Sequence, residues 1–182
     1  MLAEGKRRVQ ENKAIFSTKI IAETAVFVAL ATVLSYIQIF RLPQGGSVTA
    51  ASMVPILWLA LRRGPKVGLF AATLYGIVQL LIDPIVTHPA QVLLDYPIAF
   101  GLLGVAGFFQ NRPYIGVTVG IIGRFVSHFI SGIIFWTIYA PEGMNPAIYS
   151  AAYNGSYLLV EFVISIYAIY LLRASKVLKI YM

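Results

Sequence analysis

The sequence predicts an all-α membrane protein: a bundle of six transmembrane helices with both termini in the cytoplasm. Hydrophobic residues make up 59% of the 182-residue chain and charged residues only 12%, about half the charged fraction of an ordinary soluble domain. The chain is long enough for six segments of about 20 residues, the length that crosses a bilayer. These observations exclude a water-soluble globule and predict a single integral membrane domain over residues 1–182.

Apolar runs separated by polar turns define the expected spans. Residues 1–17 are polar and basic, and the run that follows has no convincing signal-peptide cleavage site. A Pro/Gly loop at 41–48 follows the first span, and the second span is short and contains Pro55. Residues 95–97 (D-Y-P) interrupt the fourth span, where the proline removes a backbone donor and favours a local break. The six spans cover approximately residues 18–40, 49–61, 67–82, 90–109, 114–139 and 147–172.

The basic residues set the expected orientation. An even number of spans places both termini on one side, and loops rich in lysine and arginine normally face the cytoplasm. The net charge of +7 therefore indicates membrane orientation and not a nucleic-acid partner. Cysteines are absent, which excludes disulfides and thiolate metal sites. Twelve of the fourteen basic residues fall on the expected cytoplasmic side: Lys6, Arg7, Arg8, Lys13, Lys19, Arg62, Arg63, Lys66, Arg112, Arg173, Lys176 and Lys179.

One face of the fifth span carries unusual polar chemistry. Arg124, His128, Gly132 and Trp136 recur at four-residue spacing, so they lie on one slowly drifting face of a helix. A charged group inside a membrane segment is costly unless it faces a protein interior or a wet cavity. Trp136 could be an interfacial anchor, but it could also stack on an aromatic or cationic ring. This face is therefore expected to line a cavity.

Asp95 is the expected partner of that face. It lies beside Tyr96 at the helix break, about one and a half turns inside the fourth span. A broken helix in a membrane must satisfy its free carbonyl groups in protein or in a wet cavity. An acid at such a place suits a binding cavity for a cation. The alternative is that Asp95 serves only as a structural partner of Arg124 or His128.

The sixth span adds a second polar face. Tyrosines at four-residue spacing run from Tyr149 to Tyr157 and lead to Glu161, with Asn154 one step aside. Tyrosine stripes more often serve packing, whereas an asparagine both donates and accepts, which suits the edge of a heterocycle. Glu161 and Arg124 lie at similar depth, so we predict a structural ion pair that closes the cavity floor. The polar groups converge on the outer half of the bundle, which predicts capture from outside and uptake.

Catalytic and energising motifs are absent. The sequence contains no G-x-x-x-x-G-K-[ST] phosphate loop, so the chain cannot power transport by its own ATP hydrolysis. It contains no H-E-x-x-H metal motif and no serine elbow, so neither an enzyme nor a cofactor is expected. Two alternatives stay open: an ion-coupled carrier with Asp95 and His128 as a relay, or an intramembrane enzyme using that pair as acid and base. The lack of an evident duplicated half fits the carrier poorly.

The chain resembles a known family, the thiamine-specific substrate-binding subunits (S components) of energy-coupling factor (ECF) transporters. The likeness covers nearly the whole chain. Its most specific segments are A-E-T-A-V-F-V-A-L-A, L-P-Q-G-G-S-V, P-I-L-W-L-A-L-R-R-G, H-P-A-Q-V-L-L-D-Y, H-F-I-S-G-I-I-F-W and I-Y-S-A-A-Y-N. The resemblance implies high-affinity thiamine uptake at a prokaryotic plasma membrane, through a pocket open to the outside.

The resemblance also implies site residues. Some members carry glutamate in place of Asp95, lysine in place of Arg124, or an aromatic residue in the first loop where this chain has Gly46. By resemblance the thiamine pocket is lined by Asp95, Tyr96, His128, Gly132, Trp136, Tyr149 and Asn154, with Arg124 as a further candidate.

The resemblance further implies partner subunits. Ala22, Ala25 and Ala29 are small residues at helical spacing, which lets helices approach closely in lipid. Ala25 and Ala29 are expected to dock against a transmembrane coupling subunit that carries two ATPases. Ordinary packing of these alanines within the bundle is the alternative.

Overall fold

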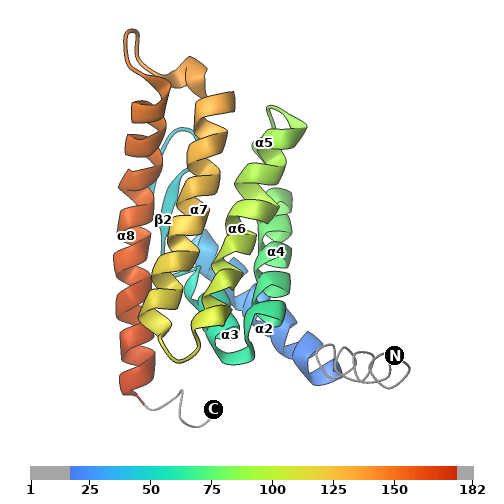
Figure 1. Ribbon diagram of the computed structural model, residues 1–182. Helices are drawn as coiled ribbons and strands as arrows, with labels where there is room; N and C mark the ends of the chain where they lie inside the picture. The colour runs from blue at the N-terminus through green and yellow to red at the C-terminus, as the bar shows by residue number, and fades with distance from the viewer. Residues whose placement is uncertain (1–16, 176–182) are drawn as a thin grey trace, which may run out of the picture.

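The computed structural model describes residues 17–175, which form an elongated bundle of helices with a short hairpin inserted among them (Figure 1). Helix α2 begins and α8 ends at the same end of the bundle. The elements are, in order, α2 (Thr18–Tyr36), β1 (Gln38–Arg41), β2 (Ser47–Thr49), α3 (Val54–Arg63), α4 (Pro65–Ile82), α5 (Pro89–Leu93), the π-helix η1 (Leu94–Ile98), α6 (Ala99–Gly101), the 3-10 helix η2 (Leu102–Phe109), α7 (Pro113–Phe135), the 3-10 turn η3 (Thr137–Tyr139) and α8 (Pro146–Ala174).

Five helical segments in the described part of the chain are long and apolar enough to cross a membrane. The predicted class, a helical multi-pass membrane protein, is therefore confirmed, with five such segments among the described residues where six spans were predicted. The segments are Thr18–Tyr36, Pro65–Ile82, Pro89–Phe109, Pro113–Phe135 and Pro146–Ala174.

The second expected span is different from the others. Helix α3 has only ten residues, about 15 Å at 1.5 Å per residue, so it is too short to cross a bilayer. Every residue from Val54 to Leu61 is buried, and the side chains of Ile56, Leu57 and Leu59 have no exposed surface. Helix α3 is thus the centre of an apolar core at the end of the bundle where α2 begins and α8 ends. A run of apolar residues does not distinguish such a core helix from a short span, because both are apolar on all sides.

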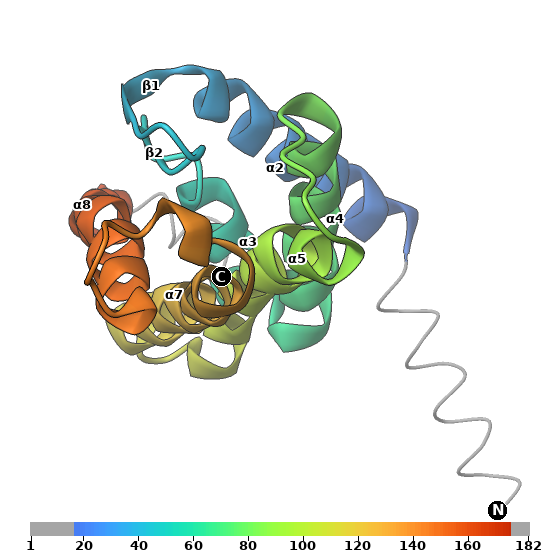
Figure 2. The same ribbon diagram turned by 90° about the horizontal axis from the view of Figure 1, so that it is seen from above.

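A hairpin replaces the end of the first expected span. Helix α2 stops at Tyr36, and the run Gln38–Arg41 pairs antiparallel with Ser47–Thr49. Only a loop was expected at 41–48, so the last apolar residues of the predicted span are strand and not helix. The turn depends on Gly45, whose φ of +89° is rarely adopted by other residues. Viewed from above, the hairpin lies between α2 and α8 (Figure 2).

The predicted break in the fourth span is confirmed. The segment Pro89–Phe109 changes from α-helix to a π-helical turn at Leu94–Ile98, which contains Asp95, Tyr96 and Pro97. The Leu94 carbonyl accepts a 2.6 Å hydrogen bond from the Ser127 hydroxyl of α7. A carbonyl at the break is therefore satisfied by protein, as the physics of a membrane interior requires.

Candidate ligand-binding site

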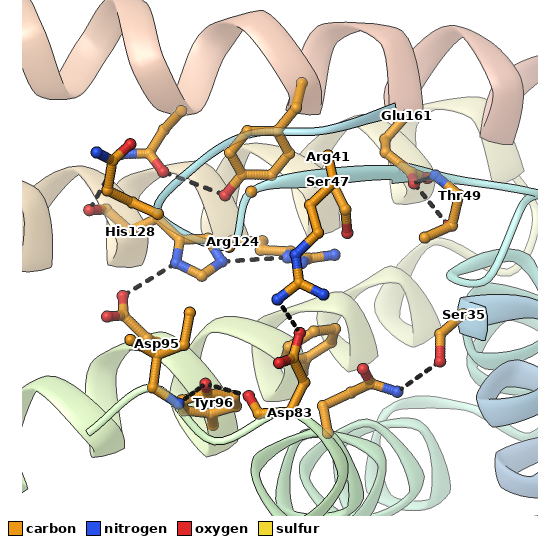
Figure 3. Close-up of a pocket in the computed structure, with 18 of the residues that line it drawn as sticks. Ser35, Arg41, Ser47, Thr49, Asp83, Asp95, Tyr96, Arg124, His128 and Glu161 are labelled. Carbon is orange, nitrogen blue, oxygen red and sulfur yellow. Dashed lines mark hydrogen bonds and ion pairs between the residues drawn. The ribbon is translucent and has the colours of Figure 1, made fainter. Parts of the chain in front are cut away.

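A cavity of about 300 Å³ lies between the hairpin, α4, α5–η1, α7 and α8 (Figure 3). This volume is at the lower end of the range typical of small-molecule sites, about 300–1,000 Å³. All eight residues predicted to contact a ligand line this one cavity: Asp95, Tyr96, Arg124, His128, Gly132, Trp136, Tyr149 and Asn154.

Asp95 is the electrostatic centre of the cavity. Its carboxylate accepts hydrogen bonds from the Gln91 amide at 2.7 Å and the Trp136 indole N–H at 3.3 Å, and its other oxygen lies 3.0 Å from His128 Nδ1. Within residues 17–175 it forms no ion pair with a lysine or arginine. About 14% of the Asp95 side chain remains exposed. The carboxylate is thus held in place and still reachable by a cation.

His128 connects Asp95 to Arg124. The Arg124 guanidinium donates its Nε–H to His128 Nε2 at 3.3 Å. A guanidinium has no acceptor, so Nε2 must accept, and a neutral ring then carries its proton on Nδ1. Nδ1 faces Asp95 and donates to it. The result is a directional chain, Arg124 to His128 to Asp95, that fixes the orientation of the imidazole ring.

The predicted ion pair between Arg124 and Glu161 is wrong. Both residues line the cavity, but the ion pairs of the described chain do not include this one. The Arg124 guanidinium lies 4.0 Å from the centre of the Phe100 ring and 2.8 Å from the Met53 sulfur.

Glu161 binds the hairpin in place of Arg124. Its Oε1 accepts from the Thr49 amide at 2.5 Å and from the Thr49 hydroxyl at 2.7 Å. Arg124 and Glu161 lie at similar depth on two helices, but depth alone did not identify the partner of Glu161. The sequence did not predict the hairpin, which supplies Thr49.

Asn154 is tied into the wall between α7 and α8. Its amide nitrogen donates to the Ser150 carbonyl at 3.0 Å and to the His128 carbonyl at 3.4 Å. Its amide oxygen accepts from the Tyr157 hydroxyl at 3.1 Å. Both donor hydrogens are therefore in use, and the free hydrogen-bonding capacity of Asn154 toward a ligand is the second lone pair of its oxygen.

Gly132 is required by helix packing. A Cβ atom at this position would overlap the Ser150 hydroxyl of α8 and come within 3.5 Å of the Asn154 amide nitrogen. The glycine therefore makes room for α8, which fills the space beside Gly132.

Tyr96 also has a structural role. Its hydroxyl donates to the Asp83 carbonyl and accepts from the Ile85 amide, both at 2.8 Å. These bonds fix the loop after α4 over the cavity. The indole ring of Trp136 is tilted against Tyr139 at 5.7 Å, and the Tyr149 ring lies 6.0 Å from the Tyr153 ring.

Several cavity residues were not proposed from the sequence. Arg41 of the hairpin forms a 2.7 Å ion pair with Asp83 at the end of α4, and both line the cavity (Figure 3). Gln91 could have been found, because it lies four residues before Asp95 on the same helical face. Arg41 could not have been, because its position depends on the hairpin.

The tyrosine stripe of α8 faces the cavity. Tyr149, Tyr153 and Tyr157 all line it, although packing was their favoured interpretation. A Cβ atom at Gly46 would lie 2.8 Å from the Tyr157 ring and 3.0 Å from the Tyr153 hydroxyl. The two tyrosines therefore occupy the space beside the hairpin turn, and an aromatic residue at position 46 would displace them.

The site combines the Asp95 carboxylate, which has no lysine or arginine partner among the described residues, with an indole, an oriented imidazole and several phenols around one cavity. Such a set suits a small, flat, positively charged ligand, because the carboxylate offsets the charge and aromatic faces attract cations. The described residues contain no group of three histidine, cysteine, aspartate or glutamate side chains placed to hold a metal ion.

Comparison with known proteins agrees with this chemistry. The family described as "Thiamine transporter protein (Thia_YuaJ)" matches residues 21–180. The "Thiamine transporter ThiT" of Bacillus subtilis (strain 168) is 34% identical, with 86% of this chain and 92% of the relative covered. The "Thiamine transporter ThiT" of Lacticaseibacillus paracasei is also 34% identical, over 81% of this chain and 83% of the relative.

A solved structure leads to the same group. ThiT from Listeria monocytogenes superposes with a TM-score of 0.78 at 26% sequence identity, covering 86% of this chain and 93% of that one. The family match spans most of the sequence, and the fold and the two bacterial relatives agree with it. The chain therefore belongs to the thiamine transporter protein family.

Proposed function

We propose that this protein captures thiamine in the cavity and delivers it as the substrate-binding subunit (S component) of an ECF transporter. Its family and both relatives at 34% identity support thiamine uptake, and those relatives are named as transporters and not as enzymes. The observation that carries the proposal is the carboxylate of Asp95, which is held by three neighbours and has no lysine or arginine partner among the described residues.

Thiamine is a cationic thiazolium ring joined to an aminopyrimidine, and the cavity offers a partner for each part. Asp95 offsets the positive charge, while Trp136 and His128 stack on or position the rings. The Tyr149 hydroxyl donates or accepts at the heteroatoms, and the free lone pair of the Asn154 oxygen accepts there. Tyr96, Gly132 and Arg124 line the site and act mainly by holding its walls. Ligand contact by these eight residues is our proposal.

The proposed orientation places the cavity toward the outside of a prokaryotic cell. The Arg62–Arg63 turn between α3 and α4 lies at the opposite end of the bundle from α5, whose Gln91 lines the cavity. Glu23 pairs with both arginines at 2.7 and 2.5 Å. By the positive-inside rule this end is cytoplasmic, with both termini. In this topology residues 1–182 form one membrane domain in which six helical segments alternate in direction, although α3 does not span the bilayer by itself.

The proposed partners are a transmembrane coupling subunit and two ATPases. Ala25 and Ala29 are exposed on α2, so within the described chain they do not serve packing of the bundle. Two small residues one helical turn apart on an exposed face would let another transmembrane helix approach closely. This exposure favours docking over the alternative of internal packing.

The decisive experiment is a thiamine titration of the purified protein followed by tryptophan fluorescence. Wild-type protein is expected to give a saturable signal from Trp136, which lies in the cavity, and not from Trp58, which is buried in the core. Asp95→Asn is expected to weaken binding strongly. Glu142→Gln, which removes an exposed acid in the loop before α8, is the matched control. Equal affinities for these two variants would contradict the proposal.

Energy coupling needs a second experiment in liposomes. Uptake of labelled thiamine is expected only when the ECF module and internal ATP are present, and an ionophore should leave it unchanged. Uptake by this chain alone that collapses with an ionophore would assign it to the ion-coupled carriers. Ala25→Leu is expected to abolish uptake and preserve thiamine binding, with the exposed Val26→Leu on the same helix as control.

A further inference from the structure

The hairpin β1–β2 has an unusual distribution of side chains. Gln38 and Arg41 of β1 line the cavity, whereas Ile39 and Phe40 lie outside its lining and are 68% and 56% exposed. A register shift between Gln38 and Phe40 makes Ile39 an extra residue in the strand. Such a bulge breaks the ordinary alternation of faces. Because of it, two consecutive apolar side chains point away from the cavity and the two polar ones point toward it.

The hairpin lies at the depth of the membrane interior. Its strand β2 is bound to α8 at two heights, by Gly46 to Tyr153 and by Thr49 to Glu161. Helix α8 has 29 residues, about 43 Å at 1.5 Å per residue, and the apolar core of a bilayer is about 30 Å thick. About 20 residues of α8 are enough to cross this core. If these are the first 20 residues of the helix, both Tyr153 and Glu161 lie inside the core; if they are the last 20, Glu161 lies inside and Tyr153 lies at its boundary. Phe40 pairs with Val48, between these two heights.

The exposed apolar side chains continue the outer surface of the neighbouring helices. The hairpin lies between α2 and α8 in the ring of elements (Figure 2). On one side, Val33 of α2 and Ile37 just after it are 60% and 55% exposed, and neither lines the cavity. On the other side, Leu159 and Val163 of α8 are 66% and 60% exposed. Both helices qualify as membrane spans, and the apolar surface passes from one to the other across Ile39 and Phe40.

We propose that Ile39 and Phe40 form a lipid-facing surface, against which acyl chains of the bilayer pack. The bundle wall is then completed between α2 and α8 by a two-stranded hairpin, with lipid on one side and the polar cavity on the other. Lipid is the occupant that fits the depth, the apolar composition and the continuity with two spans. An apolar outer face and a polar inner face is the arrangement expected of a wall between hydrocarbon and a wet cavity.

Site-directed spin labelling tests the proposal directly, because the chain has no cysteine. The single variants Ile39→Cys and Phe40→Cys are each labelled with a nitroxide and placed in phosphatidylcholine liposomes. The collision rate of the nitroxide with oxygen, which concentrates in lipid, is then compared with its collision rate with a water-soluble nickel complex. Val163→Cys on the exposed face of α8 is the lipid reference. Met144→Cys, 43% exposed in the loop before α8, is the water reference.

The expected result is an oxygen-to-nickel collision ratio at both hairpin positions within about twofold of that at Val163 and well above that at Met144. A ratio like that of Met144 would overturn the proposal, because the hairpin would face water. Low accessibility to both reagents would mean that protein covers it. Dipolar broadening between labels would assign the surface to a second copy. Either result overturns the proposal.

A second measurement avoids the label. Phe40→Trp keeps an aromatic side chain, and its fluorescence in liposomes with brominated acyl chains is compared with that of wild-type protein. Stronger quenching in the variant than in wild type is expected. Equal quenching would overturn the lipid contact. Neither measurement uses thiamine, so the outcome does not depend on the proposed function.

Discussion

Asp95 and Glu161 are both carboxylates inside membrane-spanning helices, but their surroundings differ. Asp95 accepts from Gln91 and Trp136, faces His128 and keeps 14% of its side chain exposed. Glu161 is 98% buried, since its relative exposure is 2%, and it uses one oxygen to hold Thr49. The first carboxylate is oriented and reachable, whereas the second fixes the hairpin to α8. The comparison indicates that burial of an acid in a membrane protein does not by itself identify a ligand site.

The largest effect is expected at Asp95. Asp95→Asn keeps the shape of the side chain and removes the charge that faces the cationic ligand. Loss of a charged partner in a desolvated site costs about 2–5 kcal/mol, so thiamine affinity should fall by about 30-fold or more. Fluorescence titration measures the affinity, and thermal unfolding in detergent shows whether the variant is folded. If Asp95→Asn lost stability but kept its affinity for thiamine, Asp95 would be a structural acid, as Glu161 is proposed to be, and not a ligand-binding one.

The second-largest effect is expected at Gly132, where α7 and α8 pack against each other. Gly132 lets α8, which carries Glu161, lie against α7, which carries His128, one of the partners of Asp95. Gly132→Ala places a methyl group on the Ser150 side chain, and overpacking of this kind costs about 1–3 kcal/mol. Thermal unfolding should show a midpoint lower by about 3–10 °C. The double variant Gly132→Ala, Ser150→Gly should recover much of the loss; no recovery would mean that another contact makes this glycine necessary.

A smaller effect is expected at Glu161. Glu161→Gln still offers an oxygen to Thr49 but replaces hydrogen bonds to a charged group by neutral ones, a difference of about 1 kcal/mol. The unfolding midpoint should fall by about 3 °C, and thiamine affinity should stay within about threefold of wild type. Thr49→Ser keeps the hydroxyl and serves as the control. A change in affinity larger than the change in stability would place Glu161 in the ligand site with Asp95.

The smallest effect is expected at the cavity mouth. The Arg41–Asp83 ion pair is nearly half exposed, with 45% and 44% of the two side chains accessible, and exposed pairs contribute about 0–1 kcal/mol. Arg41→Gln should speed thiamine dissociation by no more than about fivefold. Because salt screens exposed charges, raising the salt concentration should speed dissociation from wild type but not from the variant. The same salt response in both would show that this pair does not hold the mouth.

The helical faces of the site could be predicted from the sequence, whereas the contacts between elements could not. Four-residue spacing placed Arg124, His128, Gly132 and Trp136 on one face, because that period belongs to a single helix. The partner of Arg124 was wrong, because it depends on how two helices and a hairpin are arranged. The role of Asn154 was incomplete for the same reason, since Ser150, His128 and Tyr157 come from the packing of α7 against α8.

The sequence by itself determined that this is a multi-pass helical membrane protein, with a helix break at Asp95 and a polar cavity beside that break. Each of these follows from local properties: hydropathy over a span, the missing donor of Pro97 and the cost of charge in lipid. Only the tertiary structure decided that residues 38–41 form a strand, that α3 is a buried helix and that Glu161 holds Thr49. A short apolar run fits a helix end, a strand or a core helix equally well. Which of these three structures the run adopts depends on the elements that pack around it.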